Sequence, residues 1–147
     1  MRVLLQRVTR AEVTVDSEVT GSIGPGVLAL VGVGPDDTAE IATALANKAC
    51  DLRIHRDDEG RTNRSLIDTG GAMLVVSQFT LYGDTRKGRR PSFIGAAPPD
   101  LAAELVEVFA RTVEAREVAV GRGRFGAEMA VELVNDGPMT IWLDSDA

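Results

Sequence analysis

The sequence predicts a compact, β-rich α/β domain, with mixed sheets and two main helices, that spans residues 1–147. Three observations predict this class. Valine-rich and alternating segments, which are typical of strands, fill the first third of the chain and return at its end. Two segments, near residues 38–52 and after residue 98, repeat apolar residues at helical spacing. A content of 44% hydrophobic and 26% charged residues is typical of a soluble globular protein, so we do not expect disorder.

The expected strands of the first third are RVLLQRV, AEVTVD, EVTGSIG and GVLALVGV. The last segment is continuously apolar and lies between a Pro-Gly and a Gly-Pro pair, which suits a strand covered on both faces. Asp36 and Asp37 then provide N-cap chemistry for a helix over roughly residues 38–52. The polar stretch HRDDEGRTNRS, residues 55–65, is expected to form an exposed turn.

In the second half, AMLVVSQFTLY, residues 72–82, predicts a buried strand that ends in polar residues. A second helix is expected to begin after two consecutive prolines, Pro98 and Pro99. The glycine-rich GRGRFGAEM then leads to two closing strands, MAVELVND and MTIWLD, with Gly137-Pro138 between them. Pro138 has no N–H to donate to a ladder, and Asn-Asp-Gly-Pro is turn chemistry. From these residues alone, a hairpin turn is favoured over a functional backbone element.

Charge and cysteine content narrow the class of protein. The net charge of −6, from 16 basic and 22 acidic residues, argues against an unspecific nucleic-acid binder. The single cysteine, Cys50, excludes an internal disulfide, fits a reducing cytoplasm, and is interpreted as a small buried hydrophobe. The N-terminus lacks the apolar core of a signal peptide, and no segment approaches membrane-spanning length.

The residues for several familiar kinds of catalytic site are missing. With one histidine, His55, and one cysteine, the chain has no plausible zinc ligand set, and no acidic cluster suggests magnesium, so we expect neither a metal nor a cofactor. No P-loop, dinucleotide fingerprint or GxSxG elbow occurs. His55 as a base for Ser77 is a remaining possibility, but its place beside a charged turn favours a solvated histidine.

The strongest candidate for a site is the polar end of the strand in VVSQFTLYGD. If the strand continues, Ser77 and Phe79 share one face, and Gln78 and Thr80 share the other. A strand whose end is exposed to solvent, and which has no functional role, would show the same alternation of residues between the two faces. A polar strand end beside a loop is nevertheless a common place for ligand sites in α/β proteins.

A basic loop follows this strand directly. In TRKGRRPSF, residues 85–93, the cations Arg86, Lys87, Arg89 and Arg90 fall within five positions. Salt screens fields over about 8–10 Å, so an acidic protein can still carry a loop that faces phosphates. On charge alone, a solvated loop is the favoured interpretation.

Two motifs that lie far apart in the sequence indicate a resemblance to a known protein family. SQFTLYGDTRKGRRPSF, residues 77–93, and NDGPMT, residues 135–140, closely resemble the D-aminoacyl-tRNA deacylase (D-tyrosyl-tRNA deacylase) family. The opening MRVLLQRVTRAEVTVD, the segment IGPGVLALVGV and the closing WLD resemble the same family, so the similarity extends across the chain. Met139 stands where the second motif of the family usually has valine.

The resemblance implies a cytoplasmic, homodimeric hydrolase that cleaves the ester joining a D-amino acid to the terminal ribose of tRNA. It also implies a cis bond between Gly137 and Pro138, whose backbone carbonyls enter the active site of the partner subunit. There the pair would reject L-residues by a clash near Cα, while glycyl-tRNA would be accepted. Arg7 matches the family's arginine that holds this element, and Met139 lies beside it, so these four residues are the expected substrate-binding set.

For catalysis, we expect the N–H groups of Phe79 and Thr80 to act as an oxyanion hole, which stabilises the negative charge that develops on the carbonyl oxygen of the ester. Ser77 and Gln78 would orient the amino group and ester of the substrate. The expected nucleophile is water assisted by the 2′-hydroxyl of the terminal adenosine; a covalent role for Thr80 is the competing version, and no base is evident to activate it. The expected tRNA-binding residues are Arg86, Lys87, Arg89 and Arg90.

Two other functions compete with this one. A non-catalytic RNA-binding module is favoured by the basic loop and disfavoured by the scarcity of aromatic residues for base stacking. An editing domain that removes a wrong L-amino acid, like the one attached to archaeal threonyl-tRNA synthetases, is the second. The length of the chain and the intact Gly137-Pro138 pair favour the D-specific interpretation.

Overall fold

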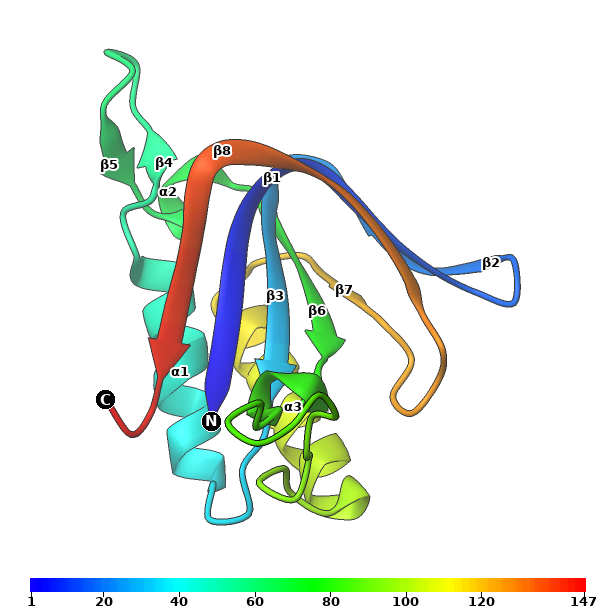
Figure 1. Ribbon diagram of the computed structural model, residues 1–147. Coiled ribbons are helices and arrows are strands. Elements are labelled where there is room, and N and C mark those ends of the chain that lie inside the picture. Colours follow the sequence, from blue (N-terminus) through cyan, green and yellow to red (C-terminus); the bar gives the residue numbers. More distant parts are fainter.

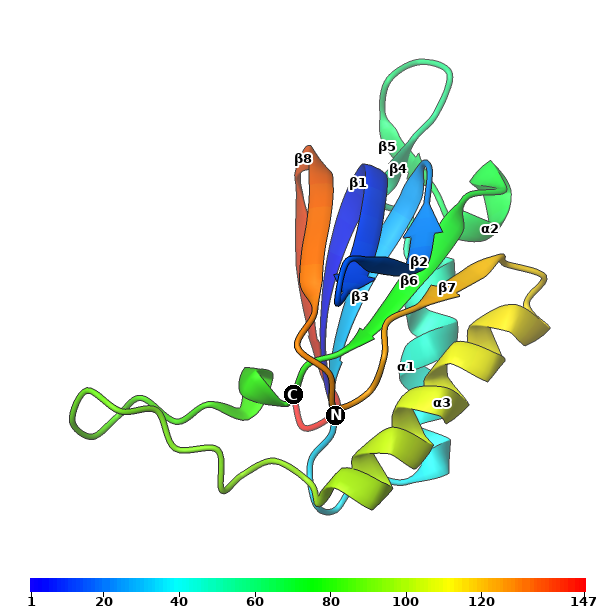
Figure 2. The same ribbon diagram turned by 90° about the vertical axis from the view of Figure 1, so that its right-hand side faces the viewer.

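A six-stranded sheet with two long helices on one face forms the centre of the computed structural model, which describes residues 1–147 (Figures 1 and 2). In chain order the elements are β1 (Arg2–Val15), β2 (Glu18–Ile23), β3 (Gly26–Gly32), α1 (Ala39–Asp51), β4 (His55–Arg56), β5 (Thr62–Arg64), α2 (Leu66–Thr69), β6 (Ala72–Ser77), the 3-10 turn η1 (Phe79–Tyr82), α3 (Pro99–Ala115), β7 (Val120–Arg122) and β8 (Ala130–Asp144). The predicted β-rich α/β class is confirmed. No helix has the length and apolar character needed to cross a membrane.

The register of the sheet defines two ends of the molecule. Strands follow the order β2-β1-β3-β6-β7, and β8 pairs with the other edge of β1. Because β3 and β6 are parallel, Gly32 and Ser77 lie at the same end, which is also the Arg2 end of antiparallel β1. The opposite end holds Val8 of β1 and Gly26 of β3. We refer to these as the carboxyl and amino ends of the sheet.

Hydrophobic cores lie on both faces of β3 and β6. The larger core packs the sheet against α1 and α3 and contains Phe109, the largest fully buried side chain. The smaller core lies where β1 and β8 curve over toward β2 (Figure 1). Successive residues of β3 and β6 alternate between the two: Val27, Ala29, Val31, Met73 and Val75 face the larger core, and Leu28, Leu74 and Val76 face the smaller. The prediction that GVLALVGV is covered on both faces is therefore confirmed.

The two long helices agree with their predicted ranges, but the expected N-cap of α1 is wrong. Thr38 is the N-cap, and its hydroxyl accepts a hydrogen bond from the Ile41 N–H at 3.3 Å. Asp37 instead accepts from the Gly34 N–H at 2.6 Å and pairs with the amino group of Met1. Its carboxylate is thus used to close the β3–α1 turn rather than to cap the helix.

The predicted strand over residues 72–82 is too long. β6 ends at Ser77, and residues 79–82 form η1, so the expected alternation of faces from Ser77 to Thr80 is wrong. The ladder on either side explains the end point: β3 pairs with β6 only as far as Ser77, and β7 only as far as Val75. Without a neighbouring strand, the chain turns.

The closing segment is one interrupted strand, which corrects both the predicted hairpin turn and the two separate strands. Both halves of β8 pair with β1. Val8 opposes Asn135 and Gln6 opposes Thr140, so a single residue of β1, Arg7, faces residues 136–139 of β8. Pro138 lies within this irregular stretch, where its missing N–H removes no ladder hydrogen bond.

Candidate functional site

The segment from Ser77 to Thr80 closes the carboxyl end of β3 and β6. The Gln78 N–H is the last to reach β3, donating to Val31 O at 2.8 Å. Phe79 and Thr80 are the first residues of η1, so their N–H groups have no partner within that turn. The side chains of both residues are exposed, and the Gln78 amide donates to the Thr80 hydroxyl. The turn therefore presents two backbone donors and two polar side chains at one edge of the sheet.

An apolar pocket of about 340 Å³ adjoins this turn. Phe79 and Phe93 both line it and meet edge to face, with ring centroids 5.2 Å apart. The first turns of α3 and the segment Phe125–Gly126 form its other walls. The polar groups of Ser77 and Gln78 also line it, so the pocket can hold an apolar group against a hydrogen-bonding edge.

Two residues that the sequence did not single out, Gly32 and Arg2, lie against the turn η1 and the residue before it. Gly32, the last residue of β3, lies so close that an added Cβ would be 2.9 Å from Gln78 O. Arg2 donates to Leu81 O at 2.9 Å, and its guanidinium lies 4.4 Å from the ring centroid of Tyr82. The hydrogen bond from Gln78 to β3 before the turn, and the contacts of Arg2 with Leu81 and Tyr82 in its second half, restrict the directions of the Phe79 and Thr80 N–H groups.

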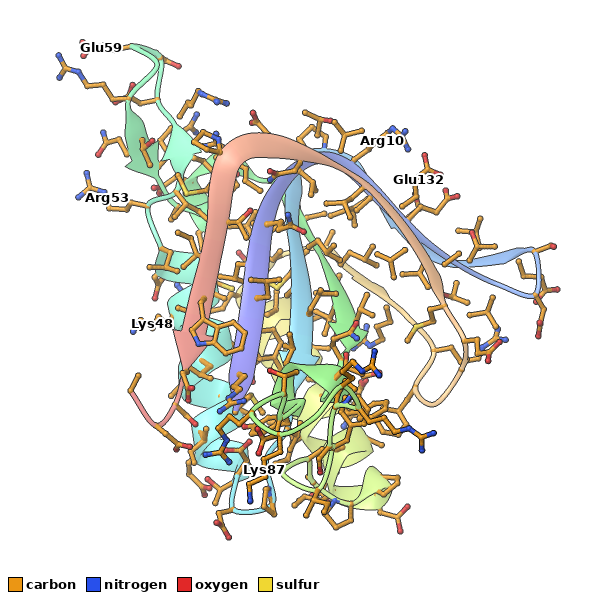
Figure 3. All side chains as sticks on the ribbon, in the orientation of Figure 1. Arg10, Lys48, Arg53, Glu59, Lys87 and Glu132 are labelled. Atoms are coloured by element: carbon orange, nitrogen blue, oxygen red, sulfur yellow. The ribbon has the colours of Figure 1, made fainter.

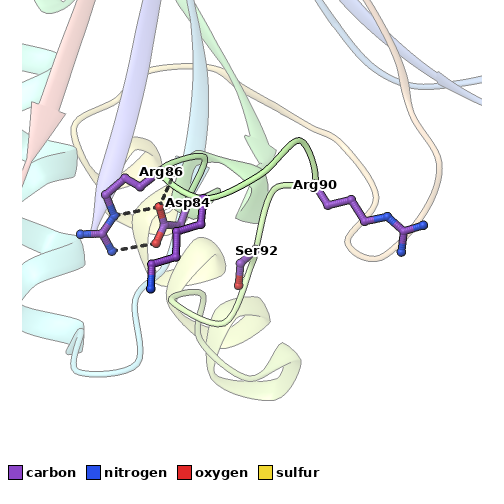
Figure 4. Close-up of a pocket in the computed structure, with 5 residues that line it drawn as sticks. Asp84, Arg86, Arg90 and Ser92 are labelled. Atoms are coloured by element: carbon purple, nitrogen blue, oxygen red, sulfur yellow. Dashed lines mark hydrogen bonds and ion pairs between the residues drawn. The ribbon is translucent and has the colours of Figure 1, made fainter.

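The basic loop is closed at its base, and its four cations are not equivalent; Figure 4 shows Arg86 paired with Asp84 and Arg90 pointing away from it. Asp84 and Ser92 exchange backbone hydrogen bonds of 2.7 and 2.9 Å across its base. Arg86 forms a two-pronged ion pair with Asp84, whose hydrogen bonds from Arg86 lower the pKa of the carboxyl to about 2. Lys87, Arg89 and Arg90 are exposed and form no ion pair. These three carry the uncompensated charge of the loop.

Gly137 and Pro138 lie at the opposite, amino end of the sheet, and the bond between them is cis. Arg7 is 3% exposed; its Nε donates to Asp136 O at 3.0 Å, and its Nη1 donates to Ile54 O at 2.6 Å. Asn135 closes the irregular stretch by donating to Arg7 O and to Met139 O, at 2.9 and 3.2 Å. The side chain of Met139 packs against the larger core.

Arg56 of β4 is a second contact to this segment that sequence reasoning missed. Its Nη1 lies 2.8 Å from each carboxylate oxygen of Asp136, and its Nη2 donates to Gly137 O at 3.3 Å. The hydrogen bonds from Arg56 lower the pKa of Asp136. In the sequence, Arg56 is one of several arginines in a polar stretch, and nothing local distinguishes it.

His55 is buried, which corrects the expectation of a solvated side chain. It is 8% exposed, and its Nε2 atom has no hydrogen-bond partner. Burial, reinforced by the neighbouring charge of Arg7, lowers the pKa of the imidazole. His55 lies at the amino end of the sheet and Ser77 at the carboxyl end, so the chain does not pair them as base and nucleophile.

The sequence-predicted site residues thus form two groups at opposite ends of the sheet. Ser77 to Thr80 and the basic loop lie at one end, and Arg7 with residues 137–139 lies at the other. A six-residue strand such as β6 is roughly 17–20 Å long, so the groups do not meet within one chain. Figure 3 shows Lys87, in the basic loop, at one end of the molecule, and Glu59, at the tip of the β4–β5 hairpin, beyond the other end of the sheet. No cluster of three or more His, Cys, Asp and Glu side chains is arranged to hold a metal ion.

Comparison with known proteins gives consistent matches over the full chain. The family model described as D-Tyr-tRNA(Tyr) deacylase matches residues 4–144. The D-aminoacyl-tRNA deacylase of Roseiflexus castenholzii is 62% identical over 99% of this chain and 92% of its own length. That of Deinococcus deserti is 56% identical over 98% of this chain and 99% of its own length.

Two solved structures share the fold. A protein named c-Myc DNA Unwinding Element Binding Protein superposes with a TM-score of 0.92 at 37% identity, with both chains fully covered. A probable eukaryotic D-amino acid tRNA deacylase superposes with a TM-score of 0.84 at 22% identity, covering 97% of each chain.

Proposed function

Because the chain belongs to the D-Tyr-tRNA(Tyr) deacylase family, and so is a hydrolase of aminoacyl-tRNA ester bonds, we propose that it releases D-amino acids from tRNA in the cytoplasm and rejects L-aminoacyl-tRNA. We include glycyl-tRNA among its substrates. The observation that carries the proposal is the family-model match over residues 4–144, a range that includes both motifs, at residues 77–93 and 135–140, together with relatives 56% and 62% identical over nearly the whole chain.

The carboxyl end of the sheet supplies the groups that ester hydrolysis needs. Attack on the ester carbonyl places negative charge on its oxygen, and the N–H groups of Phe79 and Thr80 are free to receive it. Ser77 and Gln78 line the adjoining pocket and are placed to orient the ester and the amino group. The attacking group is water, assisted by the 2′-hydroxyl of the terminal ribose. No base lies beside Thr80 to make its hydroxyl a nucleophile, since its side-chain partner is the amide of Gln78.

The amino end supplies the element that selects the D-configuration. D- and L-residues differ by exchanging hydrogen and side chain on Cα, so a rigid wall near Cα can admit hydrogen and exclude carbon. Gly137 has no Cβ and Pro138 has a fixed φ, which suits a wall made of backbone. The wall lies at the far end of its own sheet, and the resemblance to the family implies that it acts in the catalytic site of another subunit. We therefore propose a homodimer in which each chain completes the site of its partner.

The basic loop is the proposed contact to tRNA phosphates. Replacing Arg86, Lys87, Arg89 and Arg90 by alanine is expected to weaken tRNA binding and to flatten its dependence on salt, because each phosphate left without a cation reduces the slope by roughly 0.7–0.9. Arg86→Ala alone is expected to weaken binding as well, because it leaves the carboxylate of Asp84 without its partner and lowers the net charge of the loop by one. Titrations over a range of salt concentrations measure this, with the exposed Arg111→Ala of α3 as the control. An unchanged slope in the fourfold variant would identify the loop as ordinary solvated surface.

The proposed activity is tested by comparing D-tyrosyl- and L-tyrosyl-tRNA with enzyme that has been treated with EDTA and dialysed. We expect hydrolysis of the D-ester and persistence of the L-ester, without added metal. Hydrolysis of an L-ester alone would instead indicate an editing domain for L-amino acids. Binding of tRNA without any turnover would indicate an RNA-binding module. A loss of activity that zinc or magnesium restores would contradict the proposed metal-free chemistry.

A further inference from the structure

The segment that carries Gly137 is held by two arginines from different elements. Arg7 belongs to β1 and reaches the backbone oxygen and one carboxylate oxygen of Asp136, at 3.0 and 3.1 Å. Arg56 belongs to β4, and its Nη1 donates to both carboxylate oxygens of Asp136 at 2.8 Å. Asp136 therefore lies between two guanidinium groups, directly before Gly137.

The two arginines hold the segment that contains Asp136 and Gly137 in different ways. Arg7 is buried and anchored by Ile54 O at 2.6 Å, so it ties Asp136 to the interior of the protein. The side chain of Arg56 is 46% exposed and extends further along the segment, to Gly137 O at 3.3 Å. Ile54 directly precedes β4. The short segment 54–56 therefore both anchors the side chain of Arg7, through Ile54 O, and carries Arg56.

We propose that Arg56 is a specificity-determining positioning residue, which fixes the Gly137 carbonyl so that the backbone wall keeps its direction. The inference rests on the proposed function, because it assigns Arg56 to the selection step of that reaction. A guanidinium is planar and donates through several N–H groups at fixed angles, so one Arg56 side chain can hold a carboxylate and a neighbouring carbonyl together. A carbonyl oxygen has two acceptor positions, and the contact with Arg56 uses one of them.

The expected consequence is a change in selectivity rather than in rate. Without Arg56, Arg7 still holds Asp136 O, but the carbonyl of Gly137 loses its only side-chain donor and can change direction. A displacement of about 1 Å at a reacting centre can change rates about a hundredfold. A wall displaced by part of that distance would admit L-residues to the catalytic site that it completes in the partner subunit.

The test compares Arg56→Gln with Arg61→Gln. Arg61 lies on the same β4–β5 hairpin, its replacement removes the same charge, and it pairs only with Glu59. For Arg56→Gln we expect the ratio of kcat/KM for D-tyrosyl- over L-tyrosyl-tRNA to fall at least about tenfold, because the L-ester gains access to the site. For Arg61→Gln we expect both values unchanged. A loss of folded protein would lower both rates together and leave the ratio unaltered, so the ratio separates positioning from folding.

A second measurement does not depend on activity. Amide hydrogen exchange over residues 135–140 is expected to speed up in Arg56→Gln and to stay unchanged in Arg61→Gln. A selectivity ratio in Arg56→Gln equal to that of Arg61→Gln would overturn the proposal. If the wild-type chain hydrolysed neither ester, the proposed function would fail on its own, and unchanged exchange over residues 135–140 would then overturn the positioning role of Arg56.

Discussion

Gly32→Ala is expected to lower kcat for D-aminoacyl-tRNA about a hundredfold while the protein stays folded. Gly32 ends β3 directly beneath the turn that carries the proposed oxyanion donors. A Cβ added there would lie 2.9 Å from Gln78 O and 3.2 Å from Leu81 Cβ. Backbone atoms cannot rotate away as a side chain can, so the turn itself must move. The N–H groups of Phe79 and Thr80 then no longer point to the position of the developing oxyanion.

Single-turnover rates with saturating enzyme measure this effect, and thermal unfolding shows whether the variant is folded. Gly24→Ala is the matched control, because a Cβ at Gly24 would meet no heavy atom within 4 Å. We expect Gly24→Ala to react at the wild-type rate. Equal rates in the two alanine variants would contradict the assignment of the catalytic donors to η1. The test acts through Gly32 because no side-chain substitution at Phe79 or Thr80 can remove a backbone N–H directly.

The parts of the fold that depend on local chemistry could be predicted from the sequence. Apolar runs covered on both faces predicted β3 and the first part of β6, and consecutive prolines predicted the start of α3. The end of β6 at Ser77 could not be predicted in this way, because it depends on where β3 and β7 stop pairing. The same holds for His55, whose polar neighbours in sequence suggested exposure although the fold buries it.

In the candidate site, too, the features that depend on local chemistry could be predicted and those that depend on distant contacts could not. Asn-Asp-Gly-Pro has the local chemistry of a turn, but the pairing of both halves of β8 with β1 makes it an irregular stretch within one strand. Only the resemblance of two motifs pointed to a functional role for Gly137 and Pro138. Arg56 and Arg2 contact residues about 80 positions away in the sequence, and no pattern in a single sequence reports such contacts.

The glycine substrate separates two ways of selecting a D-residue. If a wall excludes carbon on one side of Cα, glycine cannot be rejected, because it carries hydrogen on both sides. L-alanine, which adds one methyl on the forbidden side, should be rejected by the clash. A hydrophobic pocket that preferred D-side chains would act differently, because the absence of one methyl group costs about 1–3 kcal/mol and would slow glycine as well.

The most direct measurement of selection at Cα compares hydrolysis of D-alanyl, glycyl and L-alanyl esters, carried on one tRNA body at equal enzyme concentration. Selection by the Gly137-Pro138 backbone predicts that glycyl-tRNA is hydrolysed at a rate like that of D-alanyl-tRNA, while L-alanyl-tRNA persists. A glycyl ester as resistant as the L-alanyl ester would contradict steric exclusion at Cα, even if D-alanyl-tRNA were hydrolysed rapidly.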